Sequence, residues 1–191
     1  VFMKAKNTIY WLMCVFFMLS SGFTQSAWEW RNPLPQGNDL NEVSYGNNQF
    51  IAVGINGTII NSPDGVKWTV RSSGTTKKLR SVIYGNNQFV TVGDSGTILM
   101  SPDGITWTER SSETTSCLES VMYGNNRFIT IGDNGTILSS TDGILWTAQS
   151  PVTKNRLYAI TYGNSQFIAV GDNSAILTSP DGVKWTEQSS G

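Results

Sequence analysis

Four aspartates at a spacing of 39 residues are the first candidates for chemistry in this sequence. Each lies in a Ser-x-Asp-Gly-x-x-Trp segment, and together they are Asp64, Asp103, Asp142 and Asp181. Converging carboxylates can hold a metal ion, whereas isolated ones cap their own turns by accepting backbone hydrogen bonds. A repeated turn separates these acids by about one repeat, far beyond the roughly 2.3–2.6 Å ligand distances of a shared cation. The spacing therefore favours turn capping, with no metal site and no cofactor.

A second set of acids occupies another repeated turn. Asp94, Asp133 and Asp172 follow a glycine in three copies, and Ile55 replaces the acid in the first copy. Short turns use aspartate to bond their own backbone, so we expect the same local role for these three carboxylates.

Composition narrows the chemistry further. The chain has no histidine, which excludes histidine-based nucleophile activation, proton shuttling and metal ligation. Lys+Arg number 13 and Asp+Glu 14. Removing residues 1–27 takes Lys4 and Lys6 but no acid, which leaves 11 bases, 14 acids and a net charge of −3. A mildly acidic protein is a poor candidate for nucleic-acid or anionic-membrane binding.

The first 27 residues have the pattern of a secretory signal peptide. Lys4 and Lys6 precede an apolar run over residues 9–19, which small residues follow. The run is shorter than the roughly 20 apolar residues of a membrane span. We expect cleavage between Gly22 and Ala27, a secreted or periplasmic product, and no integral membrane segment afterwards. Cys117 is then the only cysteine, so no disulfide can form within the chain.

The remaining residues, 28–191, repeat with a period of 39. Tyrosines recur at 45, 84, 123 and 162, and tryptophans at 68, 107, 146 and 185. A period near 40 without helical patterning indicates β-propeller blades. We therefore predict an all-β propeller of four full four-stranded blades, at about 40–73, 79–112, 118–151 and 157–191.

The second copy illustrates the expected blade. Its strands are predicted over residues 79–84, 88–92, 97–100 and 105–110. Turns fall at Asn86-Asn87, at Asp94-Ser95-Gly96 and at Pro102-Asp103-Gly104, where asparagine, glycine and proline provide the special backbone angles.

A single extra strand is expected before the first blade. Trp28-Glu29-Trp30-Arg31 resembles Trp68-Thr69-Val70-Arg71, the last strand of a blade. The blade count favours a larger propeller of which this chain is a part. A four-bladed ring with one surplus strand, an open arc and assembly with another copy remain alternatives. Open blade edges would expose apolar sheet faces, which predicts self-association.

The Ser-x-Asp-Gly-x-x-Trp turn, as in residues 62–68, resembles the Asp-box or BNR repeat of sialidase-like propellers. With the preceding Val-Gly-Asp-x-Gly-Thr-Ile-Leu segment, it is similar to the repeats of photosystem II stability and assembly factors. The resemblance implies that the Asp-box residues are structural and peripheral. They are Asp64, Trp68, Asp103, Trp107, Asp142, Trp146, Asp181 and Trp185.

Candidate binding residues lie where the copies stop agreeing. The position after the leucine that opens each blade is Asn41, Arg80, Glu119 or Tyr158. The first strand of a propeller blade lines the central channel, so these four side chains are expected at the channel mouth. They suit a polar ligand or a protein partner. The alternative is unconstrained drift at exposed loop ends.

Two classes of function follow from these observations. The first is a secreted, non-enzymatic binding or assembly scaffold with a protein or glycan ligand and no catalytic residues. The second is a sialidase-like glycoside hydrolase or a carbohydrate-binding module. For a sialidase, the resemblance would require an arginine cluster that binds a carboxylate and a tyrosine nucleophile with an acidic partner, for which Arg80, Arg110 and Tyr158 are the available residue types.

Overall fold

The computed structural model describes residues 37–189, and within them every regular element except four short 3-10 turns is a β-strand. The signal peptide and the extra strand at Trp28–Arg31 lie outside the described residues. No helix in the described part has the length and hydropathy to cross a membrane. The prediction of an all-β chain is confirmed.

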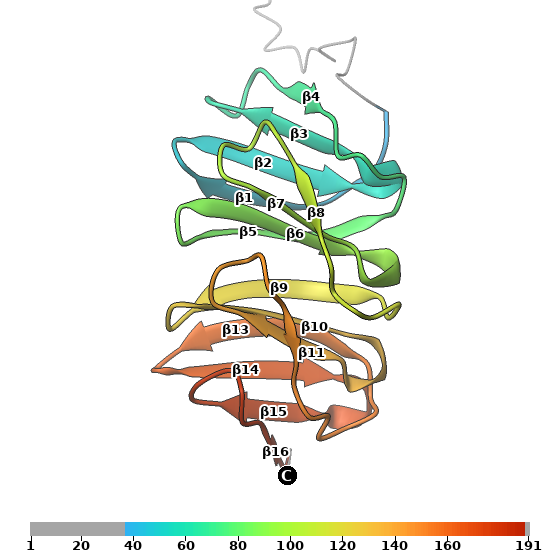
Figure 1. Cartoon of the computed structure of the whole chain (residues 1–191), viewed down its shortest axis with the longest axis vertical. Coiled ribbons are helices and arrows are strands. Elements are labelled where there is room, and N and C mark those ends of the chain that lie inside the picture. Colours follow the sequence, from blue (N-terminus) through green and yellow to red (C-terminus); the bar gives the residue numbers. More distant parts are fainter. Residues whose placement is uncertain (1–36, 190–191) are drawn as a thin grey trace, which may run out of the picture. The chain divides into compact units, whose positions relative to one another are not determined.

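The strands form four antiparallel sheets of four, each following chain order (Figure 1). The first sheet contains β1 (Leu40–Gly46), β2 (Gln49–Gly54), β3 (Ile59–Ser62) and β4 (Thr69–Arg71). The second contains β5 (Leu79–Gly85), β6 (Gln88–Gly93), β7 (Ile98–Ser101) and β8 (Thr108–Arg110). The third contains β9 (Leu118–Gly124), β10 (Arg127–Gly132), β11 (Ile137–Ser140) and β12 (Thr147–Ala148). The fourth contains β13 (Leu157–Gly163), β14 (Gln166–Gly171), β15 (Ile176–Ser179) and β16 (Thr186–Gln188).

Two tight turns shape each blade. The first hairpin of the second blade turns through Asn86 and Asn87, whose φ values of 47° and 59° are those of a type I′ turn. The second and third strands are joined by a 3-10 turn: η1 (Ile55–Gly57), η2 (Asp94–Gly96), η3 (Asp133–Gly135) or η4 (Asp172–Ser174). These turns lie where the sequence places them.

Neighbouring blades pack through apolar faces. Val53 and Ile59 of the first blade form one buried cluster with Val82 and Phe89 of the second. Equivalent clusters join the second blade to the third and the third to the fourth. The first strands of successive blades also contact one another, from β1 to β5, β9 and β13. The four first strands therefore lie on a common side of the packed blades.

The last strand of each blade is shorter than the sequence predicts. Residues 105–110 were expected to form one strand, but β8 begins only at Thr108. The Asp103 carboxylate accepts hydrogen bonds from the N–H groups of Ile105 and Thr106, both at 2.9 Å. Those two donors are therefore held in the turn and are withdrawn from the sheet.

Candidate functional site

The repeated aspartates of the Asp-box turns are occupied by their own backbone. Asp142 Oδ1 accepts hydrogen bonds from the N–H of Ile144 at 2.8 Å and of Leu145 at 2.9 Å. Ser140 Oγ donates to the same oxygen at 3.0 Å. The N–H groups of Leu145 and then Ile144 lower the pKa of Asp142, because they stabilise its charged form.

The same bonds recur at Asp64, Asp103 and Asp181, whose pKa values are also lowered by two backbone N–H groups. Within residues 37–189, no group of three or more cysteine, aspartate or glutamate side chains is placed to hold a metal ion. The Asp-box tryptophans pack beside the core phenylalanines, with ring centroids 6.4 Å apart in every blade. These eight residues build the blades.

The four candidate binding residues are the second residues of β1, β5, β9 and β13, and three of them belong to one cluster. Arg80 Nη1 donates to Glu119 Oε2 at 3.0 Å across the boundary between the second and third blades. Tyr158 joins through Arg156, whose guanidinium lies 5.2 Å from the centre of the Tyr158 ring. Asn41 stays outside the cluster and donates to the carbonyl oxygen of Leu79 at 2.6 Å.

Glu119 is the centre of this cluster. Its Oε1 accepts a hydrogen bond from Arg156 Nη2 at 2.5 Å, while its Oε2 is bonded to Arg80. The side chain is only 10% exposed, because it lies between the two arginines. A charge this enclosed is stable only because both oxygens are paired.

The second set of aspartates completes the cluster, which corrects their expected role in local turns. Asp94 Oδ1 lies 2.5 Å from Arg80 Nε. Tyr158 donates its hydroxyl to Asp172 Oδ1 at 2.7 Å. In the third blade the strand residue is Glu119, which would repel Asp133 because both are acids. Asp133 Oδ1 lies 3.0 Å from Arg156 Nε instead. These turns are held by backbone bonds, which leaves their carboxylates available to neighbouring side chains.

Arg156 belongs to the cluster, although it is not one of the four strand positions predicted to bind. It lies in the linker before β13, at the position occupied by Lys78 and Cys117 in earlier copies. The sequence contains a signal for this residue. It is a cation two residues before Tyr158 and 37 residues after Glu119, which is the only acid among the four divergent strand positions. We define Asp94, Arg80, Glu119, Arg156, Asp133, Tyr158 and Asp172 as the inner polar cluster.

Electrostatics stabilise the ionised arginines and the neutral phenol of this cluster. Burial lowers the pKa of Arg80, but the hydrogen bond to Asp94 and the charge of Glu119 outweigh it, so that the pKa is raised. The bond to Glu119 raises the pKa of Arg156. Donation to Asp172 raises the pKa of Tyr158, because ionisation would destroy that bond.

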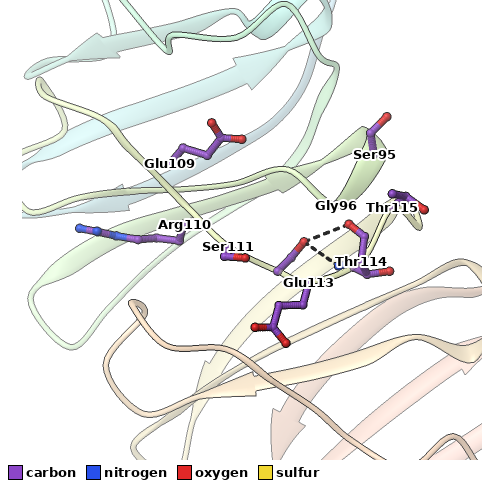
Figure 2. Close-up of a pocket in the computed structure, with 9 residues that line it drawn as sticks. Ser95, Gly96, Glu109, Arg110, Ser111, Glu113, Thr114 and Thr115 are labelled. Carbon is purple, nitrogen blue, oxygen red and sulfur yellow. Dashed lines mark hydrogen bonds between the residues drawn. The ribbon is translucent and has the colours of Figure 1, made fainter.

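Two depressions lie beside the linkers between blades. One of about 610 Å³ is lined by Ser95, Glu109, Arg110, Glu113 and Thr115, among others (Figure 2). The other, of about 630 Å³, is lined by the equivalent residues of the first blade, including Asn56 and Arg71. Because the same depression recurs in two blades, it belongs to the repeat architecture.

The arginines proposed for glycoside chemistry are not gathered at one place. Arg80 is on β5 and Arg110 on β8, which form opposite edges of the same sheet. In Figure 2 the side chain of Arg110 extends away from Ser95 and Thr115 at the linker. Arg80 is already paired with Asp94 and Glu119. The described residues therefore do not combine Arg80, Arg110 and Tyr158 into one anion-binding cluster.

Four meandering sheets, packed through apolar faces and with their first strands on a common side, define a β-propeller repeat domain. No family model matches the chain, and no curated protein matches it. The fold is similar to that of YCF48 bound to a D1 peptide, with a TM-score of 0.65 and 21% identity over 83% of this chain. The computationally designed Ika4 protein matches with a TM-score of 0.62 and 15% identity over 75% of this chain.

The similar structures also include an enzyme. The Niastella koreensis GH74 enzyme matches with a TM-score of 0.55 and 21% identity over 77% of this chain and 24% of its own. The match covers 55% of the YCF48 chain and 92% of the Ika4 chain. The chain thus spans about half the length of the YCF48 structure it matches. At these identities the comparisons show the fold, and the propeller prediction is confirmed.

Proposed function

We propose that this chain is a non-enzymatic scaffold that binds a segment of another protein at the inner polar cluster. The observation that carries the proposal is the continuity of this cluster across three blades. Its central charges are paired with one another, and its other members are accessible to solvent. Glu119 is 10% exposed, Arg156 37% and Tyr158 47%. Side chains held this rigidly by one another present a preorganised surface, which reduces the cost of binding.

The accessible groups indicate the chemistry of the partner. Lys77 and Lys154 are exposed in the linkers that precede the second and the fourth blade. A peptide segment with one or two carboxylates would complement these cations, and the face of Tyr158 would contact a flat or apolar side chain. The YCF48 structure named for its bound D1 peptide supports this choice as a fold-level analogy.

The same geometry favours binding over glycoside hydrolysis. Hydrolysis by the sialidase route requires a tyrosine nucleophile with an acidic partner, which Tyr158 and Asp172 could supply, and also arginines that are free to bind a substrate carboxylate. Arg80 and Arg156 each contact two carboxylates of this chain, which already occupy the positions that a substrate carboxylate would take. A scaffold role requires none of these groups to react.

The test is a peptide library screened against the purified chain, with affinities measured for the retained peptides. Arg156→Gln and Tyr158→Ser should weaken binding by roughly tenfold or more, as expected for central contacts. Lys184→Gln, in the exposed Asp-box turn of the fourth blade, is the matched control and should change affinity less than about twofold.

Two other outcomes would overturn the proposal. If no peptide is retained but an oligosaccharide binds on a glycan array, the chain is a carbohydrate-binding module. Turnover on a glycoside panel that is lost in Tyr158→Phe would identify a hydrolase.

We also propose that residues 1–27 direct secretion or export to the periplasm. The support is the charge and hydropathy pattern of the sequence, including Lys4 and Lys6 before the apolar run. Mass spectrometry of the mature product should find a new N-terminus between Gly22 and Ala27. A product that retains Lys4 would contradict the proposal.

A further inference from the structure

Two tripeptides of this chain share one sequence and differ in their surroundings. They are Asn56-Gly57-Thr58 and Asn134-Gly135-Thr136, the two places in the chain where glycine follows asparagine. Their asparagines and glycines occupy equivalent positions, in η1 of the first blade and η3 of the third. Because the three residues are identical, the fold decides any difference in their chemistry.

The backbone of the two turns is the same. Asn56 and Asn134 have φ values of 54° and 57°, in the left-handed region. Each turn is closed by a hydrogen bond of 3.0 Å from the threonine N–H to the carbonyl oxygen of the residue before the asparagine. Both asparagines are exposed and both glycines are buried. Backbone geometry therefore does not distinguish the two sites.

The side-chain amides of the two asparagines do differ. Asn56 Nδ2 donates to Asn38 Oδ1 at 3.1 Å, and Asn38 Nδ2 donates to Thr58 Oγ1 at 2.8 Å. The residue equivalent to Asn38 in the third blade is Ser116, whose short side chain lacks an amide. Within residues 37–189, Asn134 forms no side-chain hydrogen bond. The amide of Asn56 is thus fixed by a neighbour, whereas that of Asn134 is free to rotate.

The fourth blade shows that an asparagine at the position of Asn38 fixes this amide. Asn173 Nδ2 donates to Asn155 Oδ1 at 2.9 Å, which repeats the bond of the first blade. Asn173 is followed by Ser174 instead of glycine. Among the asparagines at this turn position, Asn134 alone combines a free amide with a following glycine.

Packing requires the glycine that follows Asn134. Gly135 has a φ of 67°, and a Cβ there would collide with the carbonyl oxygen of Thr153 in the next linker. Without a side chain, the backbone nitrogen of Gly135 is unhindered. The turn therefore places an unhindered nitrogen next to a free amide.

We propose that Asn134 is a site of spontaneous modification, at which the asparagine becomes aspartate or isoaspartate. The backbone nitrogen of Gly135 loses its proton and attacks Cγ of Asn134. A bond forms between these two atoms, the bond from Cγ to Nδ2 breaks, and the amide nitrogen leaves as ammonia with that proton. Water then opens the cyclic imide at either carbonyl carbon. The sequence of steps involves no oxidation or reduction.

The fold sets the rate through opening of the turn. Cyclisation fixes the asparagine ψ far from the 29° of the closed turn, so the turn has to open before the ring forms. At Asn56, opening also breaks the two hydrogen bonds of Asn38. We therefore expect Asn134 to be modified roughly 5–30 times faster than Asn56 in the folded chain, as two exposed hydrogen bonds predict.

The product adds a negative charge beside the inner polar cluster. Asn134 directly follows Asp133, whose Oδ1 lies 3.0 Å from Arg156 Nε. In the isoaspartate form the main chain also passes through Cβ, which lengthens the turn that carries Asp133. The reaction does not depend on the proposed peptide ligand, and its test does not require that ligand.

The test is peptide mapping by tandem mass spectrometry during incubation of the purified full chain in a mildly alkaline buffer. The fraction converted at Asn56 and at Asn134 is measured in the same sample. We expect Asn134 to be converted first in the folded chain. In concentrated urea the two identical tripeptides should be converted at similar rates, because the bonds of Asn38 are then lost.

An exchange of single residues tests the cause. Ser116→Asn gives the third blade the partner that Asn38 provides in the first, and it should slow the conversion of Asn134 to about the rate of Asn56. Asn38→Ser should accelerate the conversion of Asn56 in turn. Both positions are partly exposed, so the fold should persist, as circular dichroism would show.

Asn134→Ser is the control for the product, because Ser95 occupies this turn position in the second blade with a φ of 56°. It should remove the acidic species that the unaltered chain forms at this site, as measured by anion exchange. Equal rates at Asn56 and Asn134 in the folded chain would overturn the proposal, and so would an unchanged rate at Asn134 in Ser116→Asn. A difference that persists in urea would place the cause in the flanking sequence and overturn it as well.

Discussion

The Asp-box turns and the inner polar cluster satisfy charged side chains in opposite ways. In the turns, Asp142 bonds to backbone groups two and three residues away, and all four blades do the same. In the cluster, Glu119 bonds to Arg80 in the second blade, 39 positions away, and to Arg156 in the linker before the fourth blade, 37 positions away. A carboxylate that bonds to the backbone of its own turn can be the same residue in every blade. A carboxylate that bonds to the equivalent position of the next blade needs a residue of opposite charge there. Divergence between copies is therefore a structural requirement in the cluster.

The largest expected change in the free energy of unfolding comes from removing the carboxylate that joins two blades. Glu119→Ala leaves Arg80 and Arg156 side by side without their shared acid. We expect a loss of about 2–3 kcal/mol in the free energy of unfolding, below the full cost for a buried pair because both arginines are partly exposed. Urea unfolding at neutral pH measures it. The control is Glu109→Ala on the exposed edge strand β8, where we expect a change within about 0.5 kcal/mol. Equal losses in the two variants would contradict the central role of Glu119.

The next effect concerns the local bonds. Asp142→Ala removes the acceptor for two backbone N–H groups, at an expected cost of about 1–2 kcal/mol. The folded pKa of Asp142 is lowered by these N–H groups, so its contribution is present above the unfolded pKa of about 3.9 and is lost as the pH falls through the folded value. The difference in unfolding free energy between the unaltered protein and Asp142→Ala should therefore decrease in acid. A gap that stays constant from pH 7 to below pH 3 would argue for steric loss instead.

A smaller effect of opposite sign is expected in the linkers. Glu113 has a φ of 54°, and the equivalent residue in the previous linker is Gly74, with a φ of 74°. A left-handed conformation costs a residue with a side chain about 1 kcal/mol more than glycine. Glu113→Gly should therefore raise the unfolding free energy by about 0.5–1 kcal/mol, although glycine's flexibility in the unfolded chain offsets part of the gain. Lys154→Gly in the next linker is the control and should not stabilise, because Lys154 is not among the residues with positive φ. Destabilisation by Glu113→Gly would show that its side chain holds the linker.

The sequence allowed the repeated parts to be predicted well and the cluster only in part. The period of 39 residues and the turn residues located the blades, because each copy repeats the same local rules. The prediction grouped Asn41, Arg80, Glu119 and Tyr158 from their divergence, and the structure brings the last three into one cluster but not Asn41. It did not predict the bond between Arg156 and Glu119, and it assigned Asp94, Asp133 and Asp172 to local turns. Those pairings depend on how blades stack, and the local pattern of a single repeat does not contain that information.

The smallest expected effect concerns the exposed end of the cluster. Tyr158 is 47% exposed and donates its hydroxyl to Asp172, which raises the pKa of Tyr158 above its ordinary value of 10.0. Subtracting the ultraviolet titration of Tyr158→Phe from that of the unaltered protein isolates this one ionisation. In Asp172→Asn the negative acceptor is gone, and Tyr158 should titrate closer to an ordinary tyrosine. Because its folded pKa is raised, any stability it contributes is present below the unfolded pKa and is lost as the pH rises through the folded value. An unchanged titration in Asp172→Asn would mean that Tyr158 is held by Arg156 alone, and the cluster would then end at the linker.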